Sequence, residues 1–259
     1  MFGRRGKIRL MFIAQVDVTA HEWNDEIWGN FNSLLGSWRR NGQILGKEFP
    51  VAQVSQTYRA FLSVPERDSL DAIHDNEYSK HDRNALESQT KIEIHILGIV
   101  PETNESCECA KHSFLVLFTH FLSLESALKC GDCFQPIPIY SLPKSVLDYG
   151  IIFWESDYQA CDTLQMGCST GEEFGIREMS QHESSLSKRG RETCEVIENA
   201  TQTPTFYYLY HGEGKDESSE DERKCPSCGG EWLLETKLHD LFDFKCDACR
   251  LLSNIAFSF

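Results

Sequence analysis

The spacing of cysteines near the end of the chain could hold a metal ion. Cys225 and Cys228 form one C-x-x-C pair, and Cys246 and Cys249 form another after the seventeen residues 229–245. Each pair presents two sulfurs from one tight turn, and zinc prefers four thiolates at the corners of a tetrahedron. The spacing therefore predicts a four-cysteine Zn2+ site. Because four cysteines leave no open coordination position, we expect a structural metal.

A third C-x-x-C pair, Cys130 and Cys133, lies in the middle of the chain. A thiol redox motif would begin a helix, whereas residues 134–138 contain two prolines and predict an extended segment. One hypothesis is a second zinc site, completed by Cys161 and Cys168 or, alternatively, by Cys107 and Cys109. The other is that these thiols have no special role, and both stay open.

Other polar and aromatic groups have ordinary structural explanations beside their functional ones. One polar stretch contains four side chains that could ligate a metal, although a solvated helix face is the favoured interpretation. They are His74, Asp75, His81 and Asp82. Five basic residues could form basic surface patches, although local charge balance on helix surfaces is the favoured interpretation. They are Arg39, Arg40, Lys188, Arg189 and Arg191. Aromatic residues could stack nucleic-acid bases but favour core packing: Phe206, Tyr207, Tyr208 and Tyr210.

The sequence offers no recognisable catalytic machinery. It has no Gly-rich phosphate loop, no nucleophile elbow and no paired acid and base. We therefore expect a protein that is not an enzyme, with no catalytic residues and no evident small-molecule substrate. An enzyme using Cys130, Cys133 and nearby histidines is the least favoured hypothesis.

Composition and charge limit the possible environments and partners. The apolar run at 114–118 is too short to cross a bilayer, and Gln15 and Asp17 interrupt the apolar N-terminal segment, so we expect a cytoplasmic protein. The net charge is -15, and residues 213–222 hold six acids and one lysine. This negative charge disfavours non-specific binding to a phosphate backbone and would attract a basic partner.

Hydrophobic periodicity predicts an α+β fold with a mostly antiparallel sheet. We expect strands at 7–19, 53–64, 91–100, 113–122 and 204–210, and helices at 21–39, 75–88, 151–166, 172–181 and 186–199. Helix 21–39 has its apolar residues three and four apart, which is typical of a helix with one buried face.

The same pattern predicts three parts of the chain. Residues 1–212 form the α+β body, and residues 213–224 lack any apolar residue, which predicts a flexible linker. Residues 225–259 form a zinc ribbon with short strands at 232–234 and 242–244. Because so small a module buries little apolar surface, we expect the metal to hold it folded independently of the body.

Several stretches resemble a bacterial family of unknown function, described as zinc-ribbon-containing with a suggested nucleic-acid-binding role. They are SALKCGDCFQPIPIYSLP, CDTLQMGC, PTFYYLY, CPSCGGEW and LFDFKCDACRLLSN. The resemblance covers most of the chain and is most specific after Pro204. It implies a ribbon on an α+β body, with zinc ligands at Cys225, Cys228, Cys246 and Cys249 and no assigned reaction.

Two functional hypotheses follow. The first is a non-enzymatic zinc-ribbon binding protein whose partner is nucleic acid, as the resemblance implies. The alternative is an acidic protein-binding module, such as a cytosolic immunity or inhibitor protein that neutralises a basic partner. Neither hypothesis involves a membrane.

Overall fold

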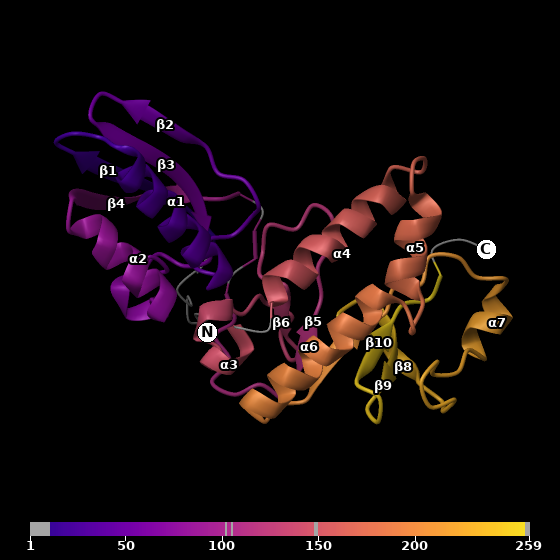
Figure 1. Ribbon diagram of the computed structural model, residues 1–259. Helices are drawn as coiled ribbons and strands as arrows, with labels where there is room; N and C mark the ends of the chain where they lie inside the picture. The colour runs from indigo at the N-terminus through magenta and orange to yellow at the C-terminus, as the bar shows by residue number, and fades with distance from the viewer. Residues whose placement is uncertain (1–10, 102, 105, 148–149, 257–259) are drawn as a thin grey trace, which may run out of the picture. The chain divides into compact units, whose positions relative to one another are not determined.

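The computed structural model describes residues 11–101, 103–104, 106–147 and 150–256. The chain divides into two compact units (Figure 1). Unit 1 comprises Met1–Glu108, Leu124–Ser126 and Gln135–Asp148, and unit 2 comprises Cys109–Ser123, Ala127–Phe134 and Tyr149–Phe259. This division differs from the predicted single body over 1–212.

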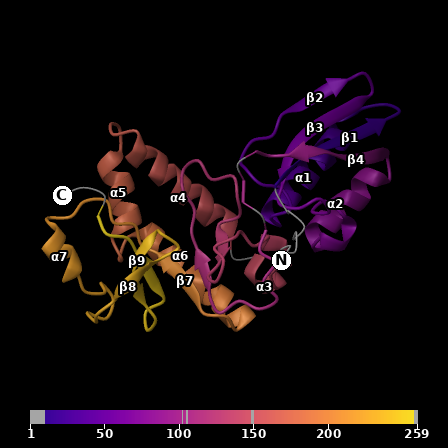
Figure 2. The same cartoon turned by 180° about the vertical axis from the view of Figure 1, so that it is seen from behind.

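Unit 1 is built on a four-stranded antiparallel sheet with the strand order β2-β3-β1-β4. Its elements follow the chain as β1 (Phe12–Ala20), α1 (Asp25–Arg40), β2 (Val51–Val54), β3 (Thr57–Val64), α2 (Glu77–Glu87) and β4 (Thr90–Ile99). This βαββαβ order is the ferredoxin-like arrangement. Both helices cover one face of the sheet, as Figures 1 and 2 show from opposite sides.

Helix α1 shows how the sequence pattern produces the core of unit 1. Its apolar stripe includes Phe31, Leu34 and Trp38, all fully buried in the cluster beneath the sheet. The helix begins at Asp25 rather than at 21, because the Asn24 side chain accepts the N–H of Ile27 at 2.8 Å and caps the first turn. The predicted periodicity is therefore confirmed.

The polar stretch after β3 serves packing. Short 3-10 turn η1 (Ala72–His74) leads into Asp75, whose side chain is 1% exposed. Asp75 accepts hydrogen bonds from Arg83 and, at 3.1 Å, from Trp38 Nε1. A carboxylate engaged in this way anchors α1 to α2, which supports the structural explanation of this stretch.

Unit 2 contains a six-stranded sheet with the order β6-β5-β7-β10-β9-β8. Its strands are β5 (Leu115–Leu117), β6 (Leu128–Cys130), β7 (Thr205–Tyr208), β8 (Leu233–Leu238), β9 (Phe242–Cys246) and β10 (Leu251–Ser253). Helices α4 (Ile151–Met166), α5 (Glu172–Ser180) and α6 (Ser185–Thr201) lie on one side of it (Figures 1 and 2). Residues 134–138 are not helical, as predicted, and in unit 1 they are followed by the 3-10 turn η2 (Ile139–Ser141) and the short helix α3 (Lys144–Leu147).

The strands of the C-terminal ribbon continue this sheet. Strand β10 pairs in parallel with β7, Leu251 opposite Tyr207, and antiparallel with β9. β7 in turn pairs in parallel with β5. Strands β8, β9 and β10 are therefore hydrogen-bonded into the sheet of unit 2, which differs from the predicted tethered module. The fold class itself, α+β with mostly antiparallel pairing, is confirmed.

The acidic segment 213–224 is also more ordered than predicted. It forms the short helix α7 (Glu217–Asp221), capped by Asp216. Glu220 is 4% exposed and accepts hydrogen bonds from Ala256 N–H at 3.2 Å, while its other oxygen lies 2.8 Å from His211 Nε2. Composition alone missed this anchor because the buried acid lies among exposed ones. None of the helices in the described ranges is both long and apolar enough to span a bilayer.

Candidate metal centres

The predicted zinc ligands Cys225, Cys228, Cys246 and Cys249 come together, and we call them the C-terminal cluster. Their four sulfurs all lie within 4.8 Å of one another. Sγ of Cys228 and Sγ of Cys246 are 3.7 Å apart. Four sulfurs bound to one zinc at about 2.3 Å lie about 3.8 Å from each other, whereas a disulfide bond is about 2.05 Å long. The spacing fits a shared metal ion.

The backbone of the C-terminal cluster forms a tight turn at each cysteine pair. In the first turn, Gly229 N–H donates to the carbonyl of Cys225 at 2.8 Å, and Gly229 has a φ of 71°. In the second turn, Arg250 follows Cys249 with a φ of 53°. The residue after each pair is thus left-handed, a conformation that glycine adopts readily and other residues adopt only under constraint.

The thiols of this cluster differ in their tendency to ionise. Hydrogen bonding from the Gly230 backbone, with help from the neighbouring thiols, lowers the pKa of Cys228 to about 7. Burial raises the pKa of Cys246 to about 12 and also raises the pKa of Cys225. Four adjacent thiols cannot all ionise without a cation between them, so the cluster is suited to a metal that binds thiolates.

Packing fixes the C-terminal cluster to the rest of unit 2. The Trp232 ring packs on Phe244 with centroids 5.1 Å apart, and the Arg223 guanidinium lies 4.1 Å from the Phe244 centroid. Arg250 binds Glu198 of α6 through two nitrogens, Nε at 2.9 Å and Nη2 at 3.0 Å. This fork-like ion pair ties the second cysteine turn to a helix of the unit.

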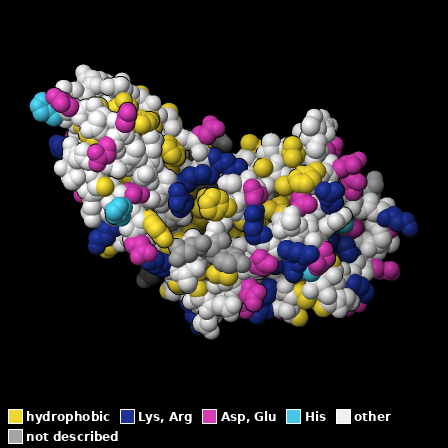
Figure 3. Space-filling model, viewed as in Figure 1, with side chains coloured by type: hydrophobic (Ala, Val, Ile, Leu, Met, Phe, Trp, Pro, Cys, Tyr) yellow, Lys and Arg dark blue, Asp and Glu magenta, His cyan; other side chains and the backbone are white. Residues whose placement is uncertain are grey.

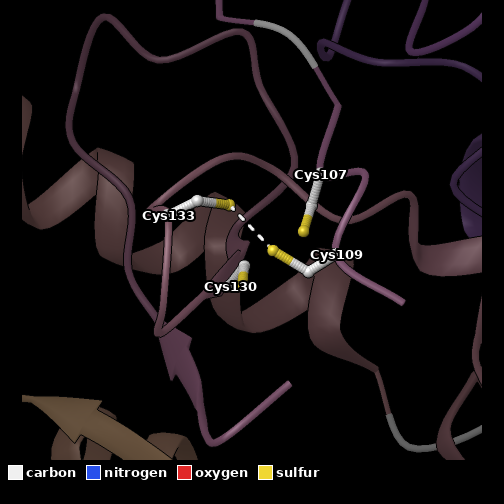
Figure 4. Close-up of side chains that lie close together, drawn as sticks. All are labelled: Cys107, Cys109, Cys130 and Cys133. Carbon is white, nitrogen blue, oxygen red and sulfur yellow. Dashed lines mark hydrogen bonds between the residues drawn. The ribbon is translucent and has the colours of Figure 1, made fainter. Parts of the chain in front are cut away.

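A second group of four sulfurs, which we call the central cluster, comprises Cys107, Cys109, Cys130 and Cys133. Figure 4 shows the four side chains pointing toward one another. All four sulfurs lie within 4.8 Å of one another, and Sγ of Cys109 and Sγ of Cys133 are 3.8 Å apart. This separation also matches the edge of a zinc–thiolate tetrahedron.

The Cys130–Cys133 turn has the same backbone as the first C-terminal turn. Phe134 N–H donates to the carbonyl of Cys130 at 2.8 Å, and Phe134 has a φ of 59°. A Cβ atom on Gly131 would meet the Phe114 ring at 2.3 Å, so this turn admits only glycine there without a shift of the ring. The turn therefore has the geometry of a metal-binding cysteine pair.

The other half of the central cluster is a C-x-C segment. Residues two apart on an extended chain point to the same side, which allows Cys107 and Cys109 to present both sulfurs together. Cys107 N–H donates to the carbonyl of Pro136 at 2.9 Å. His112 Nδ1 lies 3.3 Å from Sγ of Cys130 and can donate to a thiolate there, as residues around metal ligands commonly do.

The hypothesis that Cys161 and Cys168 complete this site needs correction. Cys161 lies on α4, 8% exposed, and lines a pocket with Leu164 and Phe174. Cys168 is exposed, and its Sγ approaches the Gln165 and Met166 carbonyls at 3.6 and 3.7 Å. Neither belongs to a metal-binding group among the described residues. The alternative pair, Cys107 and Cys109, is the one that the fold brings to Cys130 and Cys133.

The remaining candidates from the sequence serve the structure. Phe206, Tyr207 and Tyr208 are 1%, 0% and 5% exposed, so β7 presents no stacking surface at these rings. Lys188 and Arg191 lie 3.1 and 3.6 Å from Glu183 oxygens, and Arg189 pairs with Asp157. These contacts agree with core packing and local charge balance.

The fold and the two clusters define an α+β protein with two sites that can bind a metal. Three regions match models of families described as domains of unknown function: DUF8589 at residues 11–96, DUF2310 at 109–210 and DUF8594 at 214–259. An uncharacterized protein of Haemophilus influenzae is 36% identical over 239 residues, with 88% of this chain and 90% of that protein covered. The chain therefore belongs to this family of uncharacterized bacterial proteins.

Other similarities are more limited. A second uncharacterized protein of Haemophilus influenzae is 41% identical over 168 residues, covering 64% of this chain and 83% of that protein. SnoaB, a cofactor-independent oxygenase from Streptomyces nogalater, covers 36% of this chain and 99% of its own, with 13% identity and a TM-score of 0.30. A putative antibiotic biosynthesis monooxygenase from Caulobacter crescentus covers 36% and 93%, with 15% identity and a TM-score of 0.30. These scores are too low for an inference about fold or activity.

Proposed function

We propose that this chain is a non-enzymatic binding protein stabilised by two structural zinc ions, one in each four-cysteine cluster. The observation that carries the proposal is the placement of four cysteine sulfurs within 4.8 Å of one another at two sites. Zinc fits a tetrahedral set of four thiolates, and such a site has no open position for a substrate.

Metal content tests this part of the proposal. Protein purified without added metal should contain two zinc ions per chain by elemental analysis, with no visible colour. A coloured, iron-containing protein would indicate an iron or iron–sulfur centre instead, because tetrahedral thiolate sites also accept those groups. A content of one zinc would refute one of the two sites, and a content of zero would refute both.

We further propose that the partner is a basic protein. The chain carries a net charge of -15. Three lysines after residue 223 are paired with acids: Lys224 with Glu231, Lys237 with Asp243, and Lys245 with Asp247. On the face of unit 2 in Figure 3, basic and acidic side chains are interspersed. This charge distribution favours a cationic protein over a phosphate backbone.

The acidic segment supplies a testable surface. Glu213, Asp216, Asp221 and Glu222 are exposed there. If this surface attracts the partner, Asp221→Lys with Glu222→Lys should weaken binding to a co-purified basic protein and reduce its salt dependence. A matched double variant with the same charge change elsewhere, Glu173→Lys with Glu195→Lys, should have little effect.

Nucleic acid is the competing partner, favoured by the resemblance of the C-terminal stretches. Filter binding of labelled DNA and RNA at low salt distinguishes the two. Retention that falls steeply with added salt would favour nucleic acid. We expect no retention, together with a co-purifying protein of high isoelectric point.

A further inference from the structure

Unit 2 contains a pocket of about 420 Å3 that neither cluster contributes to. It lies against α4 and receives residues from the segment after β5, from the end of β7 and from the β8–β9 turn. Its size falls in the range of small-molecule sites. The lining residues are Phe118, Thr119, His120, Phe121, Tyr158, Asp162, Gln165, Met166, Tyr208, Tyr210 and Leu241.

Five aromatic side chains dominate this lining, and packing holds several of them in place. The rings of Phe118 and Tyr208 have centroids 5.2 Å apart. The Tyr208 hydroxyl donates to Asn254 Oδ1 at 2.8 Å, and Tyr158 is only 2% exposed beside Trp154. Tyr158 and Tyr208 form the buried floor, and the half-buried rings of Phe118, Phe121 and Tyr210 present the accessible aromatic surfaces of the pocket, whose faces attract cations.

One buried carboxylate is the main charged group of the pocket. Asp162 is 9% exposed, and its Oδ2 accepts the N–H of Phe121 at 2.7 Å. None of the described residues donates a hydrogen bond to its Oδ1. Burial raises the pKa of Asp162, against the opposing influence of that N–H and of His120. Because Asp162 lines the pocket, its carboxylate can also pair with a ligand bound there.

No lysine or arginine is among the described residues that line the pocket, and the exposed His120 is the sole lining side chain that could become cationic. An anionic ligand would be repelled by the Asp162 carboxylate, and no lining lysine or arginine would offset that repulsion. A neutral apolar ligand would remove water from Asp162 and return no hydrogen bond. A cation would gain from both the carboxylate and the aromatic faces.

We propose that this pocket binds a small organic ammonium cation, with Asp162 as its counter-ion and the surrounding aromatic rings as its walls. The wall residues provide cation–π attraction, and the carboxylate provides charge pairing at a partly buried site. This binding site is separate from the two metal centres, so its test is independent of the proposed zinc content and macromolecular partner.

The experiment compares choline with 3,3-dimethylbutan-1-ol, its neutral carbon analogue of similar shape. Each is titrated into the full chain with its metal bound, and backbone amide shifts of Phe121 and Gln165 report binding. We expect choline to bind with saturable shifts and the neutral analogue to bind at least about tenfold more weakly. Equal affinities, or no saturable shifts with choline, would overturn the proposal.

Variants locate the binding. Asp162→Asn keeps an oxygen for the Phe121 N–H and removes the charge, and it should weaken choline binding at least about tenfold. Asp157→Asn, on the same helix with a side chain 58% exposed, should leave the affinity unchanged. Unchanged affinity in Asp162→Asn would overturn the proposal. If that variant fails to fold, Phe121→Leu replaces it, and we expect about threefold weaker binding from the lost aromatic face.

Discussion

The C-terminal and central clusters bring their sulfurs to nearly equal separations, 3.7 Å and 3.8 Å for one pair in each, but the chain builds them differently. The C-terminal cluster combines two C-x-x-C turns, and Cys246 ends a strand of the sheet. The central cluster combines one such turn, at the end of β6, with a C-x-C segment that has no regular secondary structure. The two clusters thus have similar sulfur separations, although regular structure positions more of the C-terminal cluster than of the central one.

The difference teaches that a metal can have two roles in one fold. In the C-terminal cluster the backbone already holds the turns, and an ion would stabilise strands that pair with the rest of unit 2. In the central cluster the ion itself would order Cys107 and Cys109. Because binding that must order a segment loses free energy to that ordering, we expect tighter zinc at the C-terminal cluster.

The largest expected effect is loss of the C-terminal metal. Cys246→Ser should reduce zinc from two ions to one and destabilise unit 2 by about 5 kcal/mol or more, since structural zinc contributes about 10–16 kcal/mol in small peptides. Because β10 pairs with β7, amide protection should fall in β7 as well as in β9 and β10. Hydrogen exchange with elemental analysis measures both effects.

That experiment separates the folded arrangement from the sequence prediction of an independent ribbon. An independent ribbon would lose protection only within 225–259, while β7 kept its own. In either case β1 and β3 of unit 1 serve as the internal reference and should retain their protection. Loss of protection there too would contradict the division into two compact units.

The next effect concerns the central cluster. Cys109→Ser should also reduce the zinc content to one ion, but with a smaller fall in melting temperature than Cys246→Ser, because the C-x-C segment carries no strand of the sheet. Elemental analysis and thermal unfolding measure the two quantities. Cys168→Ser is the matched control, since Cys168 is an exposed cysteine outside both clusters, and it should retain two ions.

The central cluster also shows which part of a metal site a sequence can predict. The C-terminal ligands were predictable because each C-x-x-C pair is local and the two pairs repeat. Cys130 and Cys133 were equally visible, but their partners depend on tertiary folding, which brings Cys107 and Cys109 to them from a loop. A C-x-C spacing is no turn signature, so the sequence alone could not choose between these residues and Cys161 with Cys168.

A similar limit applies to the fold. The long helices and strands β1 and β4 followed from periodicity, which is a local property, whereas the predicted single strand at 53–64 is a hairpin of β2 and β3. The pairing of β10 with β7 joins Leu251 and Tyr207, which lie more than forty positions apart in the chain. No local sequence pattern predicts such a pairing. Strand β10 itself has three residues and was missed. The sites that depend on such pairings, including the Asp162 pocket, were therefore invisible before folding.

Two glycines sharpen the comparison of the cysteine turns. Gly131→Ala in the central cluster should cost about 1–3 kcal/mol of unfolding free energy, because the new Cβ would lie 2.3 Å from the Phe114 ring. Gly229→Ala in the C-terminal cluster should cost about 1 kcal/mol, because its φ of 71° disfavours a side chain although space is open there. Denaturant unfolding at constant free zinc measures both.

The order of these two effects is the informative result. If Gly229→Ala were the more damaging change, backbone conformation rather than packing would limit both turns. Gly230→Ala provides a control beside the C-terminal pair, since its Cβ would make only an ordinary 3.4 Å contact with Cys228 Sγ. We expect this control to change stability less than either of the other two.

The smallest expected effect concerns an ion pair in unit 1 that includes no metal-binding cysteine. It serves as a metal-independent reference for the two clusters. Arg59 donates to both oxygens of Asp17 at 2.7 Å and lowers the pKa of that carboxyl from its ordinary value. A lowered folded-state pKa gives stability that is present above the unfolded pKa and is lost as the pH falls through the folded value. Asp17→Asn should therefore speed exchange in β1 and β3 about three- to tenfold at pH 7.

At acid pH the variant and the wild type should converge, because protonation removes the same charge from Asp17 that the substitution removes. Glu93→Gln is the matched control, since Glu93 lies opposite Asp17 on β4 and pairs with the exposed Lys91. A chelator at pH 7 should leave exchange in β1 and β3 unchanged while accelerating it in β9. If the chelator also accelerated exchange in β1, the stability of unit 1 would depend on the clusters, and the contrast between metal-dependent and metal-independent parts of the chain would fail.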